Sequence, residues 1–127
     1  MEVTTKIQSF KDLVAWQKGH VLVIKVYKLT KKWPREEVFG LTSQVRRAAV
    51  SITSNISEGF SRTTSKDKAN FYSVALGSLT ELQSQLLISK DLEYITQEEF
   101  ITSSEDTILI SKLINGLIKS TRSVFRP

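Results

Sequence analysis

RRAAVSITSNISEGFSR, residues 46–62, is the stretch of sequence that decides the fold. It contains no proline, and its alanine, valine and isoleucine side chains recur at the spacing of an α-helix. Five polar residues follow one another at intervals of four, four, three and four positions: Arg47, Ser51, Asn55, Glu58 and Arg62. Because these intervals put all five on one stripe, the stretch predicts a helix whose apolar face is bordered by a polar stripe.

The same kind of pattern recurs along the chain and predicts four helices, over about residues 11–32, 41–60, 66–92 and 97–124. The first ends ahead of Pro34, because the residue before a proline is pushed out of the helical region. The fourth opens with Thr96-Gln97-Glu98-Glu99, which has the form of a capping box. Four amphipathic helices joined by short loops predict an all-α fold: a single domain over residues 1–127, built as an antiparallel up-down-up-down four-helix bundle.

The periodicity also assigns a core-facing side to each helix. In the first helix we expect this side to hold Leu13, Trp16, His20, Val23, Ile24 and Tyr27. In the second it holds Leu41, Val45, Ala48, Ala49, Ile52 and Ile56, with Gly59 as a possible stop. In the third it holds Phe71, Ala75, Leu79, Leu82 and Leu86, and Ser65 is a suitable N-cap. In the fourth it holds Ile101, Ile108, Leu113, Ile114, Leu117 and Ile118.

Composition narrows the class of protein. The chain has 127 residues, of which 40% are hydrophobic and 24% charged, as in a soluble globular domain. It has no cysteine, which excludes disulfides, thiolate catalysis and cysteine-based metal sites. Its N-terminus has no apolar segment typical of a signal peptide, and no aliphatic run is long enough to cross a bilayer. We therefore expect a cytoplasmic protein.

The residues needed for most enzyme mechanisms are missing. His20 is the one histidine, so the Glu-x-x-His pairs of di-iron bundles and HExxH are both absent. Phosphate-binding glycine loops and the GxSxG motif are absent too. Glu58 and Glu81 are the acids expected near the bundle interior, where a buried charge needs a partner such as Arg47 or Arg62. We predict no catalytic residue, no cofactor and no metal site, and a protein that is not an enzyme.

The polar stripe of the second helix is better explained by structure than by catalysis. The third helix offers a matching edge at Glu81, near the small residues Gly77 and Ser78 that let helices approach. We therefore predict a polar seam between the second and third helices, made of Gln44, Arg47, Ser51, Asn55, Glu58, Arg62 and Glu81. Such a seam fixes the pairing of helices more than it adds stability.

Positive charge is concentrated at the start of the chain. The net charge is +5, and residues 1–35 hold eight Lys and Arg against Glu2 and Asp12, a local +6. Lysines recur every seven residues on the side of the first helix away from its expected core face: Lys11, Lys18, Lys25 and Lys32. Aliphatic side chains lie among them, so this side is either a solvated face covered by lysine stems or a subunit interface. The candidates for nucleic-acid contact are Lys11, Lys18, Lys25, Lys28, Lys32, Arg35 and Arg46.

Three stretches together carry a family resemblance: FKDLVAWQKGHVLVIKVYKLT (residues 10–30), WPREEVFGLTSQVRRAAVSITSNISEGFSR (33–62) and FYSVALGSLTELQSQLLIS (71–89). They resemble the four-helix bundle proteins encoded in intervening sequences of bacterial 23S ribosomal RNA genes, over roughly residues 10–118. Gly19 departs from the pattern, which usually has alanine there, and glycine lowers helix propensity by about 1 kcal/mol.

The resemblance implies a ring-like homopentamer without enzymatic activity or cofactor. Similar proteins are the accessory variability determinants of diversity-generating retroelements, in which a basic pentamer contacts a reverse transcriptase and nucleic acid. We therefore expect a non-catalytic homo-oligomer that associates with RNA or DNA, most simply RNA, through its basic first helix. The alternative is a protein–protein scaffold, for example for a polymerase-type partner, that does not itself bind nucleic acid.

Overall fold

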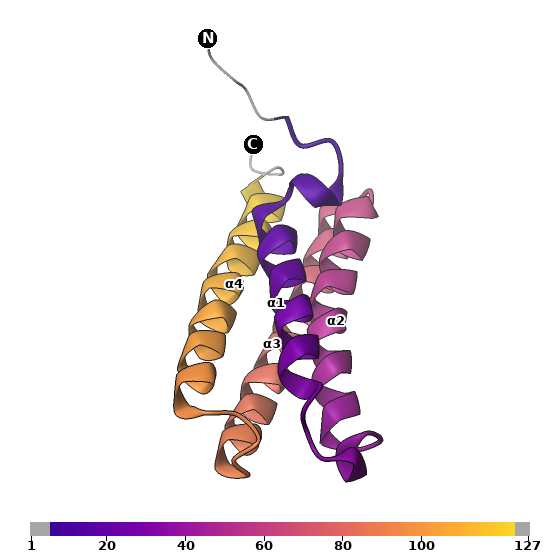
Figure 1. The fold of residues 1–127 in the computed structure, drawn as a ribbon. Helices are drawn as coiled ribbons and strands as arrows, with labels where there is room; N and C mark the ends of the chain where they lie inside the picture. The colour runs from indigo at the N-terminus through magenta and orange to yellow at the C-terminus, as the bar shows by residue number, and fades with distance from the viewer. Residues whose placement is uncertain (1–5, 124–127) are drawn as a thin grey trace.

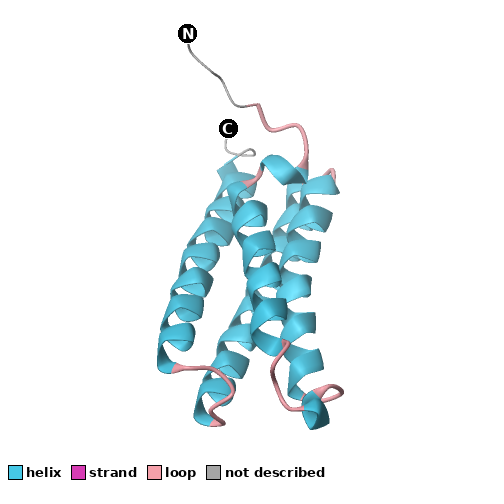
Figure 2. Ribbon diagram, in the orientation of Figure 1, coloured by secondary structure: helices cyan, strands magenta, loops and turns pink. Residues whose placement is uncertain are grey.

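The computed structural model describes residues 6–123, which form four long helices arranged as an antiparallel up-down-up-down bundle (Figure 1). The helices are α1 (Val14–Thr30), α2 (Leu41–Ser61), α3 (Ser65–Asp91) and α4 (Gln97–Ser123). Two short 3-10 helices, η1 (Phe10–Asp12) and η2 (Arg35–Glu37), precede α1 and α2. The described residues contain only helices and loops (Figure 2). The predicted fold class is confirmed, and residue 124, the predicted end of the fourth helix, lies outside the described residues.

Local hydrogen bonds explain where the helices begin. The predicted capping box is confirmed, because the Thr96 N–H donates to Glu99 Oε1 (2.9 Å) and the Glu99 N–H donates to Thr96 Oγ1 (3.0 Å). Helix α3 is capped by Thr64 rather than by Ser65, since Thr64 Oγ1 accepts the N–H of Asp67. Helix α1 begins three residues later than predicted, because Leu13 has extended backbone geometry and separates it from η1.

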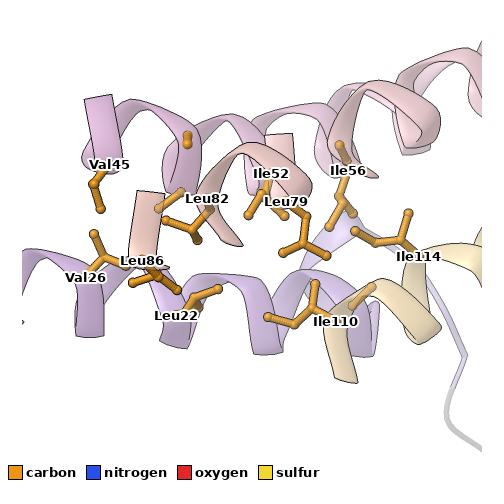
Figure 3. Packing of buried hydrophobic residues seen from close by; sticks show 14 of the residues in the cluster. Leu22, Val26, Val45, Ile52, Ile56, Leu79, Leu82, Leu86, Ile110 and Ile114 are labelled. Atoms are coloured by element: carbon orange, nitrogen blue, oxygen red, sulfur yellow. The ribbon is translucent and has the colours of Figure 1, made fainter. Parts of the chain in front are cut away.

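The core lies along the central axis and takes aliphatic side chains from all four helices (Figure 3). Its largest members are at most 1% exposed and include Leu22 and Val26 of α1, Ile52 of α2, Leu82 of α3 and Ile114 of α4. Full burial of one such side chain stabilises the fold by roughly 1.5–3 kcal/mol. Helices α1 and α3 each pack against both α2 and α4, which closes the bundle around this core.

The predicted core face of α1 is wrong. The buried residues are Ala15, Gly19, Leu22, Val26 and Thr30, whereas Ile24 is 44% and Tyr27 39% exposed. His20 is exposed as well, and of the predicted face only Leu13, Trp16 and Val23 pack partly against the core. Helix α1 is apolar on most of its circumference, so apolar spacing alone does not fix its rotation. Gly19 helps to fix it, because a Cβ atom there would lie 2.9 Å from Cγ2 of Thr53, so the missing side chain allows α1 to approach α2 closely.

The other helices agree better with the prediction. On α2 the expected face is buried, with Leu41 half-buried at its start. On α3 the core side runs through Tyr72 while Phe71 is half-buried. On α4 the prediction fails for Ile101 and Ile108, which are 46% and 50% exposed. Two polar residues, Ser103 and Thr107, are fully buried on this helix instead, which apolar periodicity does not anticipate.

Gly59 has a packing role and does not end its helix. Helix α2 continues through Gly59 to Ser61, and no glycine in the described residues has a positive φ. A Cβ atom at Gly59 would lie 2.7 Å from Cε1 of Tyr72 and 3.1 Å from Cβ of Phe71. Glycine is therefore required here by the close approach of α3. Gly77 has the opposite environment, since a Cβ atom there would meet nothing within 4 Å, so it does not mediate helix contact.

Candidate functional site

Three of the four lysines at seven-residue spacing, Lys18, Lys25 and Lys32, lie beside carboxylates of α4. Lys25 Nζ donates to Asp106 Oδ2 at 2.8 Å, and Lys32 Nζ lies 3.8 Å from Glu99 Oε2. Lys18 lines a small hollow that also contains Asp106. The chain therefore offsets part of this positive stripe with its own carboxylates, which makes Lys25 and Lys32 weak candidates for contact with an external phosphate.

A second group of cations surrounds an open groove between α1, the following loop and the first half of α2. This α1–α2 groove has a volume of about 710 Å³. None of the described residues that line it is acidic. The lining residues are Tyr27, Thr30, Lys31, Trp33, Val38, Thr42, Ser43, Arg46, Arg47, Val50, Ser51 and Ser54. Three cations on one concave surface without a carboxylate give a region of positive potential.

Arg46 is held in a fixed position at this groove. Its guanidinium carbon lies 4.5 Å from the centre of the Tyr27 ring, and its Nε donates to Thr30 Oγ1 at 2.8 Å. The Thr30 hydroxyl is itself fixed, because it donates to the backbone carbonyl of Val26 at 2.8 Å. Within the described residues the two terminal nitrogens of Arg46 have no acceptor. The side chain thus presents a flat, immobilised cation with free donors.

The two other cations of the groove are free to contact a ligand. Lys31 and Arg47 are exposed, and neither side chain forms an ion pair or hydrogen bond within residues 6–123. Lys28 and Arg35 lie nearby along the chain and are likewise exposed and unpaired in the part of the chain described. Of these residues, Lys28, Arg35 and Arg46 are among the cations that the sequence predicts for nucleic-acid contact. Arg47 is predicted for the polar seam instead, and no sequence signal marks Lys31.

Two buried polar atoms in the groove lack partners. Trp33 is 8% exposed and Thr42 is 6% exposed, yet neither Trp33 Nε1 nor Thr42 Oγ1 has a hydrogen-bond partner. An unsatisfied buried donor is unfavourable by about 1–3 kcal/mol, so such atoms are rare in folded proteins. Both residues line the same groove. Sequence reasoning missed them, because only the fold brings the end of α1 next to the start of α2.

Glu37 anchors the loop that carries one wall of the groove. Its Oε1 accepts the N–H of Leu41 at 3.0 Å, and its Oε2 accepts the hydroxyl of Tyr94 at 2.9 Å. These bonds, with the Leu41 N–H the larger cause, hold the pKa of Glu37 below its ordinary value of 4.5. The hydrogen bond to Glu37 raises the pKa of Tyr94 above its ordinary value of 10.0. Tyr94 also packs on Trp33, with ring centres 5.4 Å apart, so the loop is attached to the turn that follows α3.

The predicted polar seam is assembled only in part. Ser51 Oγ and Ser78 Oγ share a hydrogen bond of 2.7 Å between α2 and α3, and the Asn55 amide donates to Ser51 Oγ at 3.0 Å. Glu58 pairs with Arg62 at 3.5 Å, but Glu58 lies on α2 and Arg62 is the residue that directly follows it. Glu81 accepts a hydrogen bond from Gln85, its neighbour on α3.

A small hollow between α2 and α3 completes this edge and is lined by Gln44, Arg47, Ala48, Ser51 and Glu81. The expected charge pairs between α2 and α3 are absent from the described residues, and serine hydroxyls make the contact in their place. Arg47 borders both this hollow and the α1–α2 groove.

The described residues contain no cluster of His, Asp or Glu with the geometry of a metal site. His20 stacks on Trp16, with ring centres 4.9 Å apart. Over the same part of the chain, no helix combines the length and apolarity that crossing a bilayer requires.

Fold and site together define the class: an all-α four-helix bundle with a cationic groove between its first two helices. The model of the 23S rRNA-intervening sequence protein family matches residues 11–116. The chain belongs to this family, which confirms the resemblance seen in the sequence.

A solved structure gives the same fold. It is that of a protein with unknown function from the S23 ribosomal protein family of Bacteroides thetaiotaomicron, and the two chains are 29% identical with a TM-score of 0.78. The similarity covers 86% of this chain and 98% of that one. Among curated proteins, none matches this chain. The relation to retroelement accessory proteins stays a prediction.

Proposed function

We propose that this protein is a non-catalytic, oligomeric RNA-associated protein that holds phosphates at its α1–α2 groove. The observation that carries the proposal is the convergence of Lys31, Arg46 and Arg47 on one groove whose described lining includes no acid. Cationic side chains without an internal carboxylate partner are the groups that gain from contact with a phosphate backbone. Such contacts give affinity and position without reading the base sequence.

The proposal moves the centre of the interface away from the lysine stripe. Lys25 and Lys32 are engaged by Asp106 and Glu99, so releasing them for a phosphate would break existing ion pairs. Of the other predicted cations, Lys28 and Arg35 are exposed near the groove along the chain and are assigned to weaker contacts there. Lys11 lies in η1 and Lys18 in the hollow beside α4, so neither is assigned to the groove.

Self-association is the second part of the proposal. Val21 of α1 is 63% exposed and Leu109 of α4 is 44% exposed, and both line one hollow on the α1–α4 side. Val14 and Ile24 on α1 and Ile108 on α4 add further exposed aliphatic surface. Exposed aliphatic side chains on two neighbouring helices favour a protein interface on this side. A homopentamer, as the family resemblance implies, would repeat the groove five times and strengthen weak RNA contacts through multivalency.

The test is binding of the purified, nuclease-treated protein to a structured RNA across a salt series. Affinity should fall steeply as salt rises, by about 0.7–0.9 log units per log unit of salt for each phosphate contact. Failure to bind even at low salt would contradict the proposed function. Light scattering on the same sample tests assembly, and a monomer at micromolar concentration would contradict the oligomeric part.

A specific observation favours a second candidate, a scaffold for a protein partner such as a reverse transcriptase. Phe39, in the loop before α2, is 97% exposed, and its neighbour Val38 is 47% exposed. A bulky apolar side chain presented by an anchored loop is suited to insertion into a partner. The test is capture of a polymerase-type partner after nuclease treatment. Capture that is lost in Phe39→Ala but kept in a groove variant that no longer binds RNA would favour this candidate.

A further inference from the structure

We propose that the α1–α2 groove accommodates one unpaired RNA nucleotide, with its base stacked on Arg46 and its phosphate bound by Arg47 and Lys31. This inference rests on the proposed RNA association and narrows it from a charged surface to a site for a single nucleotide.

The chemistry of the groove lining favours a ligand with negative charge and hydrogen-bond acceptors. Its charged groups are all cations, Lys31, Arg46 and Arg47, and the indole N–H of Trp33 can only donate. The remaining polar side chains are hydroxyls, which both donate and accept. A matching ligand must therefore carry negative charge and hydrogen-bond acceptors. A nucleotide has both, in its phosphate and in the ring nitrogens and carbonyl oxygens of its base.

Arg46 is arranged so that a flat ring can stack on it. One face of its guanidinium covers the Tyr27 ring at 4.5 Å, and the hydrogen bond from Nε to Thr30 keeps this orientation. A base laid on the opposite face would extend this pair into a stack of ring, cation and base. Unpaired RNA bases stack on arginine planes as they do on aromatic rings. Because Arg46 is already ordered, binding does not have to restrict its side chain.

The buried polar atoms without partners favour a ligand that supplies hydrogen-bond acceptors at the bottom of the groove. Trp33 Nε1 and Thr42 Oγ1 lie in the groove lining and are unsatisfied. A base edge that reached the bottom of the groove would provide acceptors for both, with a small shift of the side chains that cover them. Ligands that satisfy buried donors gain specificity, because analogues without the acceptors leave those donors unpaired.

Size and shape favour an unpaired nucleotide over a duplex. The volume of about 710 Å³ lies within the roughly 300–1,000 Å³ of pockets that hold small organic ligands. A base pair stacked inside a duplex cannot enter a concave pocket, whereas an unpaired base can turn out of its strand. An acidic peptide would satisfy the charge requirement, but a carboxylate side chain has no broad flat surface to stack on Arg46.

The experiment follows the indole N–H resonances of the wild-type protein, with Trp16→Phe used only to assign them. The probes are a single-stranded RNA of about a dozen nucleotides, the same RNA annealed to its complement, adenosine monophosphate and an oligoglutamate peptide. We expect the single strand to shift the Trp33 resonance and leave that of Trp16 in place. The duplex should leave both unchanged, and oligoglutamate should not displace the single strand. Adenosine monophosphate should shift the Trp33 resonance weakly, since it lacks the phosphates on either side.

Two conservative substitutions separate this site from simple charge attraction. Arg46→Lys keeps the charge but removes the flat surface, and Thr42→Val removes the hydroxyl at nearly constant shape. Loss of one base stack corresponds to a roughly tenfold weaker affinity, so Arg46→Lys should bind the single strand about tenfold less tightly and the duplex about as well as before. Thr42→Val should show a smaller loss, again confined to the single strand.

The outcomes distinguish the two proposals. If RNA binds with strong salt dependence but leaves the Trp33 resonance unmoved, the single-nucleotide site is overturned while the proposed function stands. Equal losses for single strand and duplex in Arg46→Lys would overturn it too. A shift of the Trp33 resonance caused by adenosine monophosphate but not by RNA would make the groove a site for a free nucleotide. Displacement of the single strand by oligoglutamate would make it a site for an acidic protein segment. Either result contradicts the RNA assignment. Absence of all RNA binding would remove the proposed function itself.

Discussion

Two glycine-to-alanine substitutions should change stability in opposite directions, although both lie inside helices. At Gly59 the new Cβ atom would lie 2.7 Å and 2.9 Å from two carbons of the Tyr72 ring, and Tyr72 is 3% exposed. The ring cannot move away without displacing the core. At Gly77 the new atom would meet nothing within 4 Å.

The expected free energies follow from two opposing effects. Alanine improves helix propensity by about 1 kcal/mol at either position. Overpacking of a core costs roughly 1–3 kcal/mol, and it applies only at Gly59. Gly77→Ala should therefore raise the free energy of unfolding by up to about 1 kcal/mol. Gly59→Ala should lower it, by up to about 2 kcal/mol, so that the two variants differ by roughly 1–3 kcal/mol.

Urea denaturation followed by circular dichroism measures this difference directly. Wild type and both variants should unfold with similar slopes and with midpoints in the order Gly77→Ala, wild type, Gly59→Ala. Equal stabilisation by both substitutions would refute the argument that α3 approaches α2 too closely for a side chain at Gly59. Destabilisation by Gly77→Ala would show that this part of α3 is covered by a neighbouring molecule in solution.

Three further predictions concern the loop, the lysine stripe and the core. The folded-state pKa of Glu37 lies below 4.5, so the carboxylate stabilises the fold above that pH, and this stabilisation is lost as pH falls through the folded-state pKa. Acid titrations of Glu37→Gln should therefore show a smaller loss of stability than wild type in this pH range. A stability profile identical to that of wild type would contradict the anchoring role. Lys25→Met removes an ion pair whose partners are 33% and 42% exposed, so it should lower the free energy of unfolding by less than about 1 kcal/mol. RNA affinity should stay unchanged in a binding titration, and a large drop in affinity would show that Lys25 contacts RNA. Leu82→Ala empties a fully buried position in the core and should destabilise the protein by roughly 2–5 kcal/mol in urea titrations, a value near zero being incompatible with the observed packing.

The sequence is a good guide to the fold because the number and ends of the helices depend on local signals. The Thr96–Glu99 capping box places the start of α4 correctly, and the break before Pro34 places the end of α1 within two residues, at Lys32 instead of Thr30. Helix α2 has polar and apolar residues on clearly separate sides, so its buried face follows directly from spacing. The extended geometry of Leu13 has no such signal, and the start of α1 was placed too early.

The rotation of α1 and α4 could not be predicted from apolar spacing. In α1, Gly19 helps to select the buried side, because a Cβ atom there would lie 2.9 Å from Cγ2 of Thr53. In α4, the hydroxyl of buried Thr107 donates to the carbonyl of Ser104 and accepts the amide of Gln83 on α3 at 3.1 Å, which lets a polar residue occupy the core at low cost. Close approach and hydrogen bonds between helices are tertiary properties.

The candidate site was predicted less well than the fold for the same reason. Positive charge in the first segment is visible in the sequence, but its pairing with α4 carboxylates, as in Lys25–Asp106, depends on the rotation of α1. The α1–α2 groove combines the end of one helix with the start of the next. Only the folded chain shows that Arg46 is fixed on Tyr27 and that Trp33 and Thr42 have unsatisfied polar atoms there.

The most direct test of the central claim compares two double variants that lose the same charge. Lys31→Gln/Arg47→Gln neutralises the groove. Lys66→Gln/Lys119→Gln neutralises two exposed lysines, one at the start of α3 and one near the end of α4; these helix ends lie at the opposite end of the bundle from the start of α2 (Figure 1). With a single-stranded RNA, the groove variant should bind more weakly, and its plot of log affinity against log salt should be shallower by about 0.7, which corresponds to loss of the one phosphate that both side chains bind. The control variant should keep the wild-type slope. Equal slopes in the two variants would show that RNA responds only to overall charge and would contradict the assignment of the α1–α2 groove.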